Sequence, residues 1–203
     1  MTFPIDFRVM ELLCARLCHE LVSPVAAINN GVELLGEEDP DFVKDAIALL
    51  GQSARKAGQR LQFYRFAYAG TGSGASSDCR ALVDGLLESG KVRCEWRLDP
   101  AALDGGLQKL GCNLLALAAD ALPRGGTVTI AAAEGAQGFS VVAEGAAVNF
   151  SEETRAALDP GAAVDDLTSR TIHAHFTALL ARRRGAALSF RLEPARLVFL
   201  VTL

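Results

Sequence analysis

A histidine followed directly by an acid, His19-Glu20, is the best candidate for covalent chemistry in this sequence. A neutral imidazole has a free lone pair, so His19 can act as a nucleophile and carry a transferred group. Phosphoryl transfer suits such a residue, because the reaction depends mainly on in-line placement and charge neutralisation, which a partner's active site can supply. The pair therefore suggests a group presented to another protein.

Two polar neighbours are candidates to assist His19. Glu20 could orient the ring or take its proton, although it lies about 100° further around a helix. Ser23, one turn beyond, could hydrogen-bond near the transferred group, or its hydroxyl could bond a backbone carbonyl within the helix. Pro24 follows and removes the helical hydrogen bond to the Glu20 carbonyl, which predicts a kink one turn beyond the histidine.

The first 69 residues predict the elements that position His19. Apolar or small residues recur at spacings of three and four over residues 10–35 and again over residues 43–68. This periodicity predicts two helices, and Pro40 fits just inside the start of the second. The short connection predicts an antiparallel hairpin. Since one hairpin buries little surface, we expect two copies to pair as a four-helix bundle. The alternative is a monomer whose hairpin packs on the rest of its own chain.

His19 points away from the apolar seam of the first helix. At about 100° per residue, Met10, Leu21 and Leu35 fall within about 20° of the side opposite His19. Most residues on the histidine face are small or apolar, which suits docking by another protein. A helix face that merely tolerates small residues is the alternative interpretation.

A basic flank is predicted beside His19 on the second helix. No acid occurs from Ala46 to Ala69, and the returning helix should pass His19 near residue 57. Positive charge there would steer an acidic partner, although a solvated charged face is the alternative. The candidate partner-contact residues are Leu12, Arg16, Val22, Ala26, Asn30 and Glu33 on the first helix, and Arg55, Lys56, Gln59, Arg60 and Phe63 on the second.

Residues 70–77, GTGSGASS, predict a linker, and residues 78–203 predict a second domain. Its predicted helices are 79–88, 107–122 and 168–184. Its predicted strands are 91–98, 125–134 and 138–144, followed by a terminal hairpin at 186–203 with a turn near Glu193 and Pro194. This mixture of helices and antiparallel strands indicates a two-layer α/β sandwich. The expected fold class is therefore α+β, a helical hairpin over residues 1–69 followed by that sandwich.

Composition restricts the partners and the compartment. The net charge of −4 argues against nucleic acid as the main partner. We expect no membrane contact, because no apolar stretch reaches the roughly 20 residues that span a bilayer and the N-terminus lacks a signal-peptide pattern. The five cysteines are odd in number and irregularly spaced, which argues against a disulfide framework and for a reduced, cytoplasmic protein. We expect no bound metal.

The run from His19 to Ile28, HELVSPVAAI, resembles the phosphoacceptor box of bacterial histidine kinases, H-E-L-[RS]-[TN]-P-L-x-x-I. The longer LCARLCHELVSPVAAINNGVELL is similar to the ChpT family of histidine phosphotransferases, and the resemblance extends over the whole chain. It implies a homodimer with two acceptor histidines. It also implies a relay, in which the receiver-domain aspartate of a hybrid histidine kinase phosphorylates His19, which then phosphorylates response-regulator aspartates that govern the cell cycle. Mg²⁺ is expected from the partner receiver domain.

The second domain resembles a kinase ATP-binding domain of the Bergerat type but departs from it at three features. The kinase pattern N-L-L-x-N-A is matched at Asn113, but Leu117 replaces the Mg²⁺-binding asparagine and cannot ligate a metal. Ala143 and Ala147 stand where the acid and second glycine of D-x-G-x-G belong, and residues 165–176 lack the glycines of the lid. We expect a degenerate domain without ATP binding or autokinase activity. It would brace the bundle and offer the partner a second surface.

Three other functions remain open. The chain could be an adaptor that binds receiver domains without carrying phosphate. It could be a true histidine kinase, which Leu117 and Ala143 disfavour. It could also be a phosphatase for receivers, with Ser23 placing a water. His173 and His175, on a predicted helix, are interpreted as non-catalytic.

Overall fold

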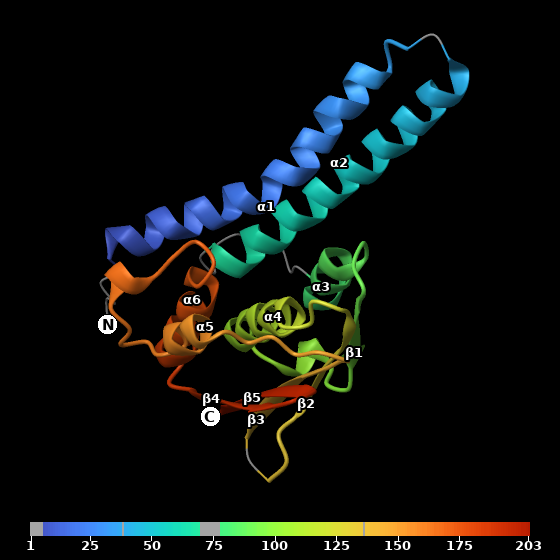
Figure 1. Ribbon diagram of the computed structural model, residues 1–203. Coiled ribbons are helices and arrows are strands. Elements are labelled where there is room, and N and C mark those ends of the chain that lie inside the picture. Colours follow the sequence, from blue (N-terminus) through green and yellow to red (C-terminus); the bar gives the residue numbers. More distant parts are fainter. Residues whose placement is uncertain (1–5, 38, 70–77, 136) are drawn as a thin grey trace.

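Two long helices project from an α/β unit in the computed structural model, which describes residues 6–37, 39–69, 78–135 and 137–203 (Figure 1). Helix α1, Phe7–Leu34, and helix α2, Pro40–Tyr68, pack against each other as an antiparallel hairpin. Asp6 and Asp39 cap their N-termini by accepting backbone N–H groups. Pro40 begins α2 as expected, because its missing N–H would be unpaired in the first turn anyway. The predicted linker, residues 70–77, lies outside the described residues.

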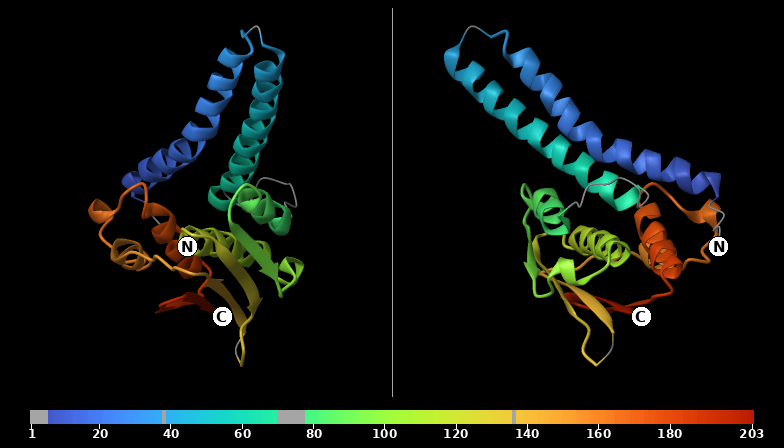
Figure 2. Two further views of the ribbon diagram at one scale, coloured as in Figure 1. Left: turned by 45° about the vertical axis from the view of Figure 1, so that its right-hand side comes forward. Right: turned by 180° about the vertical axis from the view of Figure 1, so that it is seen from behind.

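Helix α1 changes direction about midway along its length (Figures 1 and 2). Pro24 lies inside the helix, is buried, and has no N–H to donate to the Glu20 carbonyl. The bend therefore fits the predicted kink. Its consequence is that the first half of α1 lies over the α/β unit, where it contacts α6 and η2, while the second half extends outward with α2.

A five-stranded sheet in the order β1-β2-β3-β5-β4 forms the layer furthest from the hairpin (Figure 1). The strands are β1 Val92–Trp96, β2 Gly126–Ala132, β3 Gly138–Glu144, β4 Ala187–Glu193 and β5 Arg196–Thr202. Strand β1 pairs with β2 in parallel, whereas the other neighbours are antiparallel. The expectation of antiparallel strands was thus wrong for β1, because the helix between β1 and β2 makes a crossover connection.

A helical layer lies between the sheet and the hairpin (Figure 2). It contains α3 Cys79–Leu87, α4 Gly105–Asp120, the short α5 Glu152–Ala157 and α6 Ile172–Arg183, with 3₁₀ turns η1 Pro100–Ala102 and η2 Val164–Asp166. Helix α4 is buried over most of its length, since it has the sheet on one side and the hairpin on the other. The sequence predicted α3, α4 and α6. It did not predict α5, η1 or η2, which are too short to show a periodic pattern.

One cluster of buried residues runs from the sheet to the base of the hairpin. It includes Phe199 on β5, Leu114 on α4, Phe63 on α2 and Leu12 on α1. The base of the hairpin therefore packs on its own chain, as the monomer alternative predicted. Further out, both helices leave large apolar side chains exposed, so packing within the chain does not use the whole seam.

A disulfide joins Cys79 on α3 to Cys112 on α4, with 6.5 Å between their Cα atoms. The expectation of fully reduced cysteines was wrong for this pair. Spacing along the sequence could not reveal it, because only the packing of α3 on α4 brings the two residues together. Cys14, Cys18 and Cys94 are free thiols.

Candidate functional site

His19 is exposed on α1, five residues before Pro24. The face around it is also open, since Val22 is 64% exposed and Ser23 and Ala26 are exposed as well. Asn30 and Glu33 continue the exposed face toward the tip of the hairpin. A visiting protein can therefore approach the imidazole over a surface of small and apolar side chains.

Two residues predicted to contact a partner are instead buried. Leu12, two turns before His19 on the same face, is 7% exposed because this part of α1 packs on the α/β unit. Phe63 is 0% exposed and belongs to the same core. Both predictions were wrong, because the helical pattern alone could not show which faces the second domain covers.

Glu20 faces arginines. One carboxylate oxygen accepts a hydrogen bond from Arg60 on α2, and the other lies 3.3 Å from a guanidinium nitrogen of Arg16 on its own helix. Because both oxygens are paired in this way, Glu20 acts here as an ion-pair partner. The expected role in orienting the His19 ring or taking its proton does not match this arrangement.

The predicted basic flank is smaller than its sequence suggests. Arg60 is paired with Glu20, and the Gln59 amide donates to Glu88, directly after α3. Arg55 is exposed and Lys56 half-buried. Gln59 and Arg60 therefore have partners within the chain, because the fold places acids from other segments beside them, and their contact with a second protein stays a prediction.

Arg16 reaches beyond the hairpin. Its guanidinium donates to the Asp120 carboxylate at the end of α4, with a nitrogen-to-oxygen distance of 2.9 Å. Arg16 was predicted as a partner contact, but its side chain is only 12% exposed and is committed to contacts within the chain. Asp120 is a residue that the sequence analysis missed. The available signal was an acid at a helix C-terminus, where the dipole disfavours negative charge.

Asn113, which matches the first asparagine of the kinase pattern, links α4 to α2 in the structure. Asn113 is fully buried, and its amide donates to the carbonyls of Lys109 at 2.8 Å and of Ala67, on α2, at 3.4 Å. Leu117 is buried in the core. The end of α2 therefore occupies the surface of α4 at this level.

Among the described residues, histidines, cysteines and acids do not gather in groups of three or more that could hold a metal ion. None of the described helices combines the length and apolar character that crossing a bilayer requires.

Comparison with known proteins identifies the family. Residues 76–196 match the family described as the histidine phosphotransferase C-terminal domain. The chain belongs to this histidine phosphotransferase family. It is 30% identical over 209 residues to protein phosphotransferase ChpT of Brucella abortus (strain 2308), covering 98% of this chain and 99% of that protein. A solved bacterial phosphotransferase shares 29% identity with a TM-score of 0.79, covering 98% of each chain.

The predicted α+β fold is confirmed by the match to this bacterial phosphotransferase structure, which covers 98% of the chain and so includes both the helical hairpin and the sheet-containing part. The predicted resemblance to histidine phosphotransferases is likewise confirmed at the level of the family.

Proposed function

We propose that this histidine phosphotransferase works in a multistep phosphorelay. His19 accepts a phosphoryl group from the receiver-domain aspartate of a hybrid histidine kinase and passes it to the aspartates of response regulators. Membership of the family supports phosphotransfer, and the exposed His19 in the run HELVSPVAAI supports this residue as the acceptor. The resemblance of the chain to its family extends the proposal to regulators of the cell cycle in the cytoplasm.

The chemistry needs little from this chain beyond an accessible imidazole. A ring nitrogen of His19 attacks the phosphorus, an N–P bond forms, and the P–O bond to the aspartate breaks with its electrons leaving on the carboxylate. The receiver supplies Mg²⁺ and cationic groups that offset the charge of the transferring group. Transfer to the next aspartate is the same step in reverse. Ser23 is exposed one turn from His19, where its hydroxyl can hydrogen-bond the phosphoryl oxygens.

A homodimer is part of this proposal, and the apolar face opposite His19 supports it. Val25 and Val32 on α1 are about half exposed, and Ile47 and Leu61 on α2 are exposed to a similar degree. Ile47, Ala54 and Leu61 are spaced by seven residues, as in helices that pack with others in a bundle. A second hairpin on this face would leave both histidines pointing outward.

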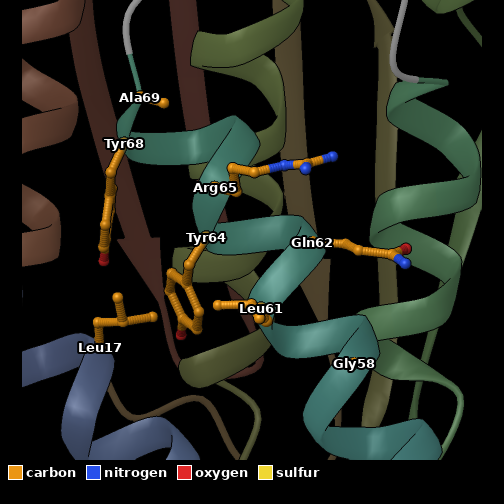
Figure 3. Close-up of a pocket in the computed structure, with 8 residues that line it drawn as sticks. All are labelled: Leu17, Gly58, Leu61, Gln62, Tyr64, Arg65, Tyr68 and Ala69. Atoms are coloured by element: carbon orange, nitrogen blue, oxygen red, sulfur yellow. The ribbon is translucent and has the colours of Figure 1, made fainter. Parts of the chain in front are cut away.

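A hollow of about 670 Å³ at the base of the hairpin lies on the same apolar seam. Figure 3 shows Leu17 of α1 pointing toward Tyr64 and Leu61 of α2 at one end of it. Burying such a surface is favourable by about 25 cal/mol per Å² of apolar area, so a second copy that covers it gains stability.

The second domain, over residues 78–203, is proposed to bind no ATP. Leu117 cannot ligate Mg²⁺, and Asn113 is engaged with α2. Calorimetric titration with Mg-ATP tests this directly. Measurable binding would contradict a degenerate domain, and labelling of the protein from ATP alone would show kinase activity.

The relay is tested by mixing the purified protein with a receiver domain carrying labelled aspartyl phosphate. Acid-labile label should appear on the wild-type protein and be absent from His19→Ala. Ala48→Ser, an exposed change on α2, is a matched control that should leave labelling unchanged. If the wild type binds the receiver but takes no label, the chain is an adaptor. If the receiver releases free phosphate without a labelled intermediate, the chain is a phosphatase.

A further inference from the structure

Four charged side chains form a continuous row beside His19. Arg60 on α2 pairs with Glu20 on α1, Glu20 with Arg16 at 3.3 Å, and Arg16 with Asp120 on α4 at 2.9 Å. Two positive and two negative charges alternate, so the row is neutral as a whole. It connects both helices of the hairpin with the central helix of the α/β unit.

The row is partly removed from water. The side chains of Arg16, Glu20 and Arg60 are 12%, 16% and 24% exposed. Charges held this far from solvent lose hydration, so each depends on its partners, and removing one leaves the others uncompensated. Burial lowers the pKa of Arg16, but Asp120 and the two neighbouring tyrosines raise it by more, so this guanidinium stays charged.

Asp120 has a specific reason to pair with Arg16. It is the last residue of α4, where unpaired carbonyl groups give the helix end a partial negative charge. An acid at that end is unfavourable by itself, and a cation beside it reverses the effect. Arg16 of the hairpin supplies this cation, so contact with α1 offsets the unfavourable charge at the end of α4.

Arg16 and Glu20 flank His19 along the helix. They lie three residues before it and one after it, within about a single turn. The ion pair of Arg16 with α4 and the ion pair of Glu20 with Arg60 therefore fix the rotation of this turn about the helix axis. The same turn comes directly before Pro24, which leaves the Glu20 carbonyl without its helical hydrogen bond and so constrains the helix geometry less.

We propose that Arg16 is a positioning residue for phosphotransfer: by linking Glu20 to Asp120, it holds the His19 turn in the orientation that a docked receiver meets. This inference rests on the proposed function of His19. In-line transfer is sensitive to placement, since a shift of about 1 Å can reduce a rate by about a hundredfold. Arg16 touches neither the phosphoryl group nor the receiver in this role.

The test compares single-turnover transfer from a labelled phosphoreceiver to wild type, Arg16→Ala, Arg16→Lys and Asp120→Asn. The maximal rate at saturating receiver should fall about tenfold or more in Arg16→Ala, less in Asp120→Asn, and partly recover in Arg16→Lys, which keeps the charge. The receiver concentration giving half the maximal rate should change little. Circular dichroism at the assay temperature shows whether each variant is folded.

A matched control is Arg97→Ala, which removes another arginine-carboxylate pair, with Glu95 at 2.9 Å, that is exposed and far from His19 in the sequence. Its rate should equal that of the wild type. A variant of Arg16 or Asp120 that is folded and transfers at the rate of Arg97→Ala overturns the positioning role. So does a loss confined to the half-saturating concentration, which would make Arg16 a partner contact.

If Arg16→Ala does not fold, the rate of Asp120→Asn tests the positioning role instead. The Asp120 side chain is 59% exposed, so the substitution is tolerated sterically. If the wild type itself takes no label, the proposed function fails and this role fails with it. If the wild type transfers and the variants match it, only the positioning role fails.

Discussion

The hydroxyl of Tyr68, the last residue of α2, lies 2.9 Å from Nδ1 of His173 on α6. The other ring nitrogen, Nε2, lies 3.2 Å from the carbonyl oxygen of Asn113 on α4. A carbonyl can only accept, so Nε2 carries the proton and Nδ1 accepts from Tyr68. The imidazole thereby joins the base of the hairpin to two helices of the α/β unit in its neutral form.

The neutral form of His173 should make stability depend on pH. Burial lowers its pKa to about 4 from an ordinary value of 6.5. The unfolded chain therefore binds a proton more readily than the folded protein between these values, so stability falls as the pH drops from about 6.5 toward 4. At pH 5 the expected loss is about 2 kcal/mol relative to pH 7.5.

Urea unfolding at both pH values measures this effect. His173→Gln, which cannot titrate, should be less stable at pH 7.5 but should lose about 2 kcal/mol less on acidification. His19→Gln, which replaces a histidine exposed on α1, is the control for the loss of a histidine as such. Equal pH dependence in His173→Gln and the wild type would contradict this assignment.

Phe63 and Val22 should behave oppositely when shortened to alanine. Phe63 is fully buried, so Phe63→Ala should reduce the free energy of unfolding by about 3–5 kcal/mol. Val22 is largely exposed beside His19, so Val22→Ala should change stability little but weaken receiver binding. Urea unfolding and titration with a receiver domain separate the two. A Phe63→Ala protein of normal stability, or a Val22→Ala protein with unchanged affinity, would contradict these placements.

Arg55 should affect the rate at which a receiver associates. It is exposed on α2, and reversing its charge in Arg55→Glu should slow association with an acidic receiver at low salt. The difference from the wild type should shrink as salt screens the charges. Stopped-flow association at two ionic strengths measures it, with Arg191→Glu on the edge strand β4 as an exposed control. An unchanged rate at low salt would remove steering by this residue.

Leu61 should determine the oligomeric state. It is half exposed on the face of α2 proposed to meet a second copy, so Leu61→Glu would bury a charge in the dimer and should shift it toward monomers. Sedimentation measures this, and Ala48→Glu, which adds the same charge at an exposed position about 140° around α2 from Leu61, is the matched control. A wild-type protein that sediments as a monomer at high concentration would contradict the dimer.

Local patterns were enough to predict much of this molecule. Helical periodicity and Pro40 predicted the hairpin, and the apolar run of α4 predicted a buried central helix. The pattern around His19 also predicted an exposed histidine. Such signals are local in the sequence, so the packing of distant segments does not erase them.

Contacts between distant segments could not be predicted in this way. Leu12 lies on the histidine face by helix geometry, yet the α/β unit covers it. The sequence predicted Arg60 as part of a basic flank, whereas in the structure Glu20 pairs with it. The parallel pairing of β1 and the Cys79–Cys112 disulfide likewise depend on how helices and strands pack across many residues.

Mass spectrometry of the protein after incubation with a phosphorylated receiver shows whether His19 carries the phosphoryl group. Under alkaline conditions that preserve phosphohistidine, we expect one phosphoryl group on the peptide containing His19, lost on acid treatment and absent from His19→Ala. Phosphate on another residue, or undiminished transfer through His19→Ala, would contradict this role.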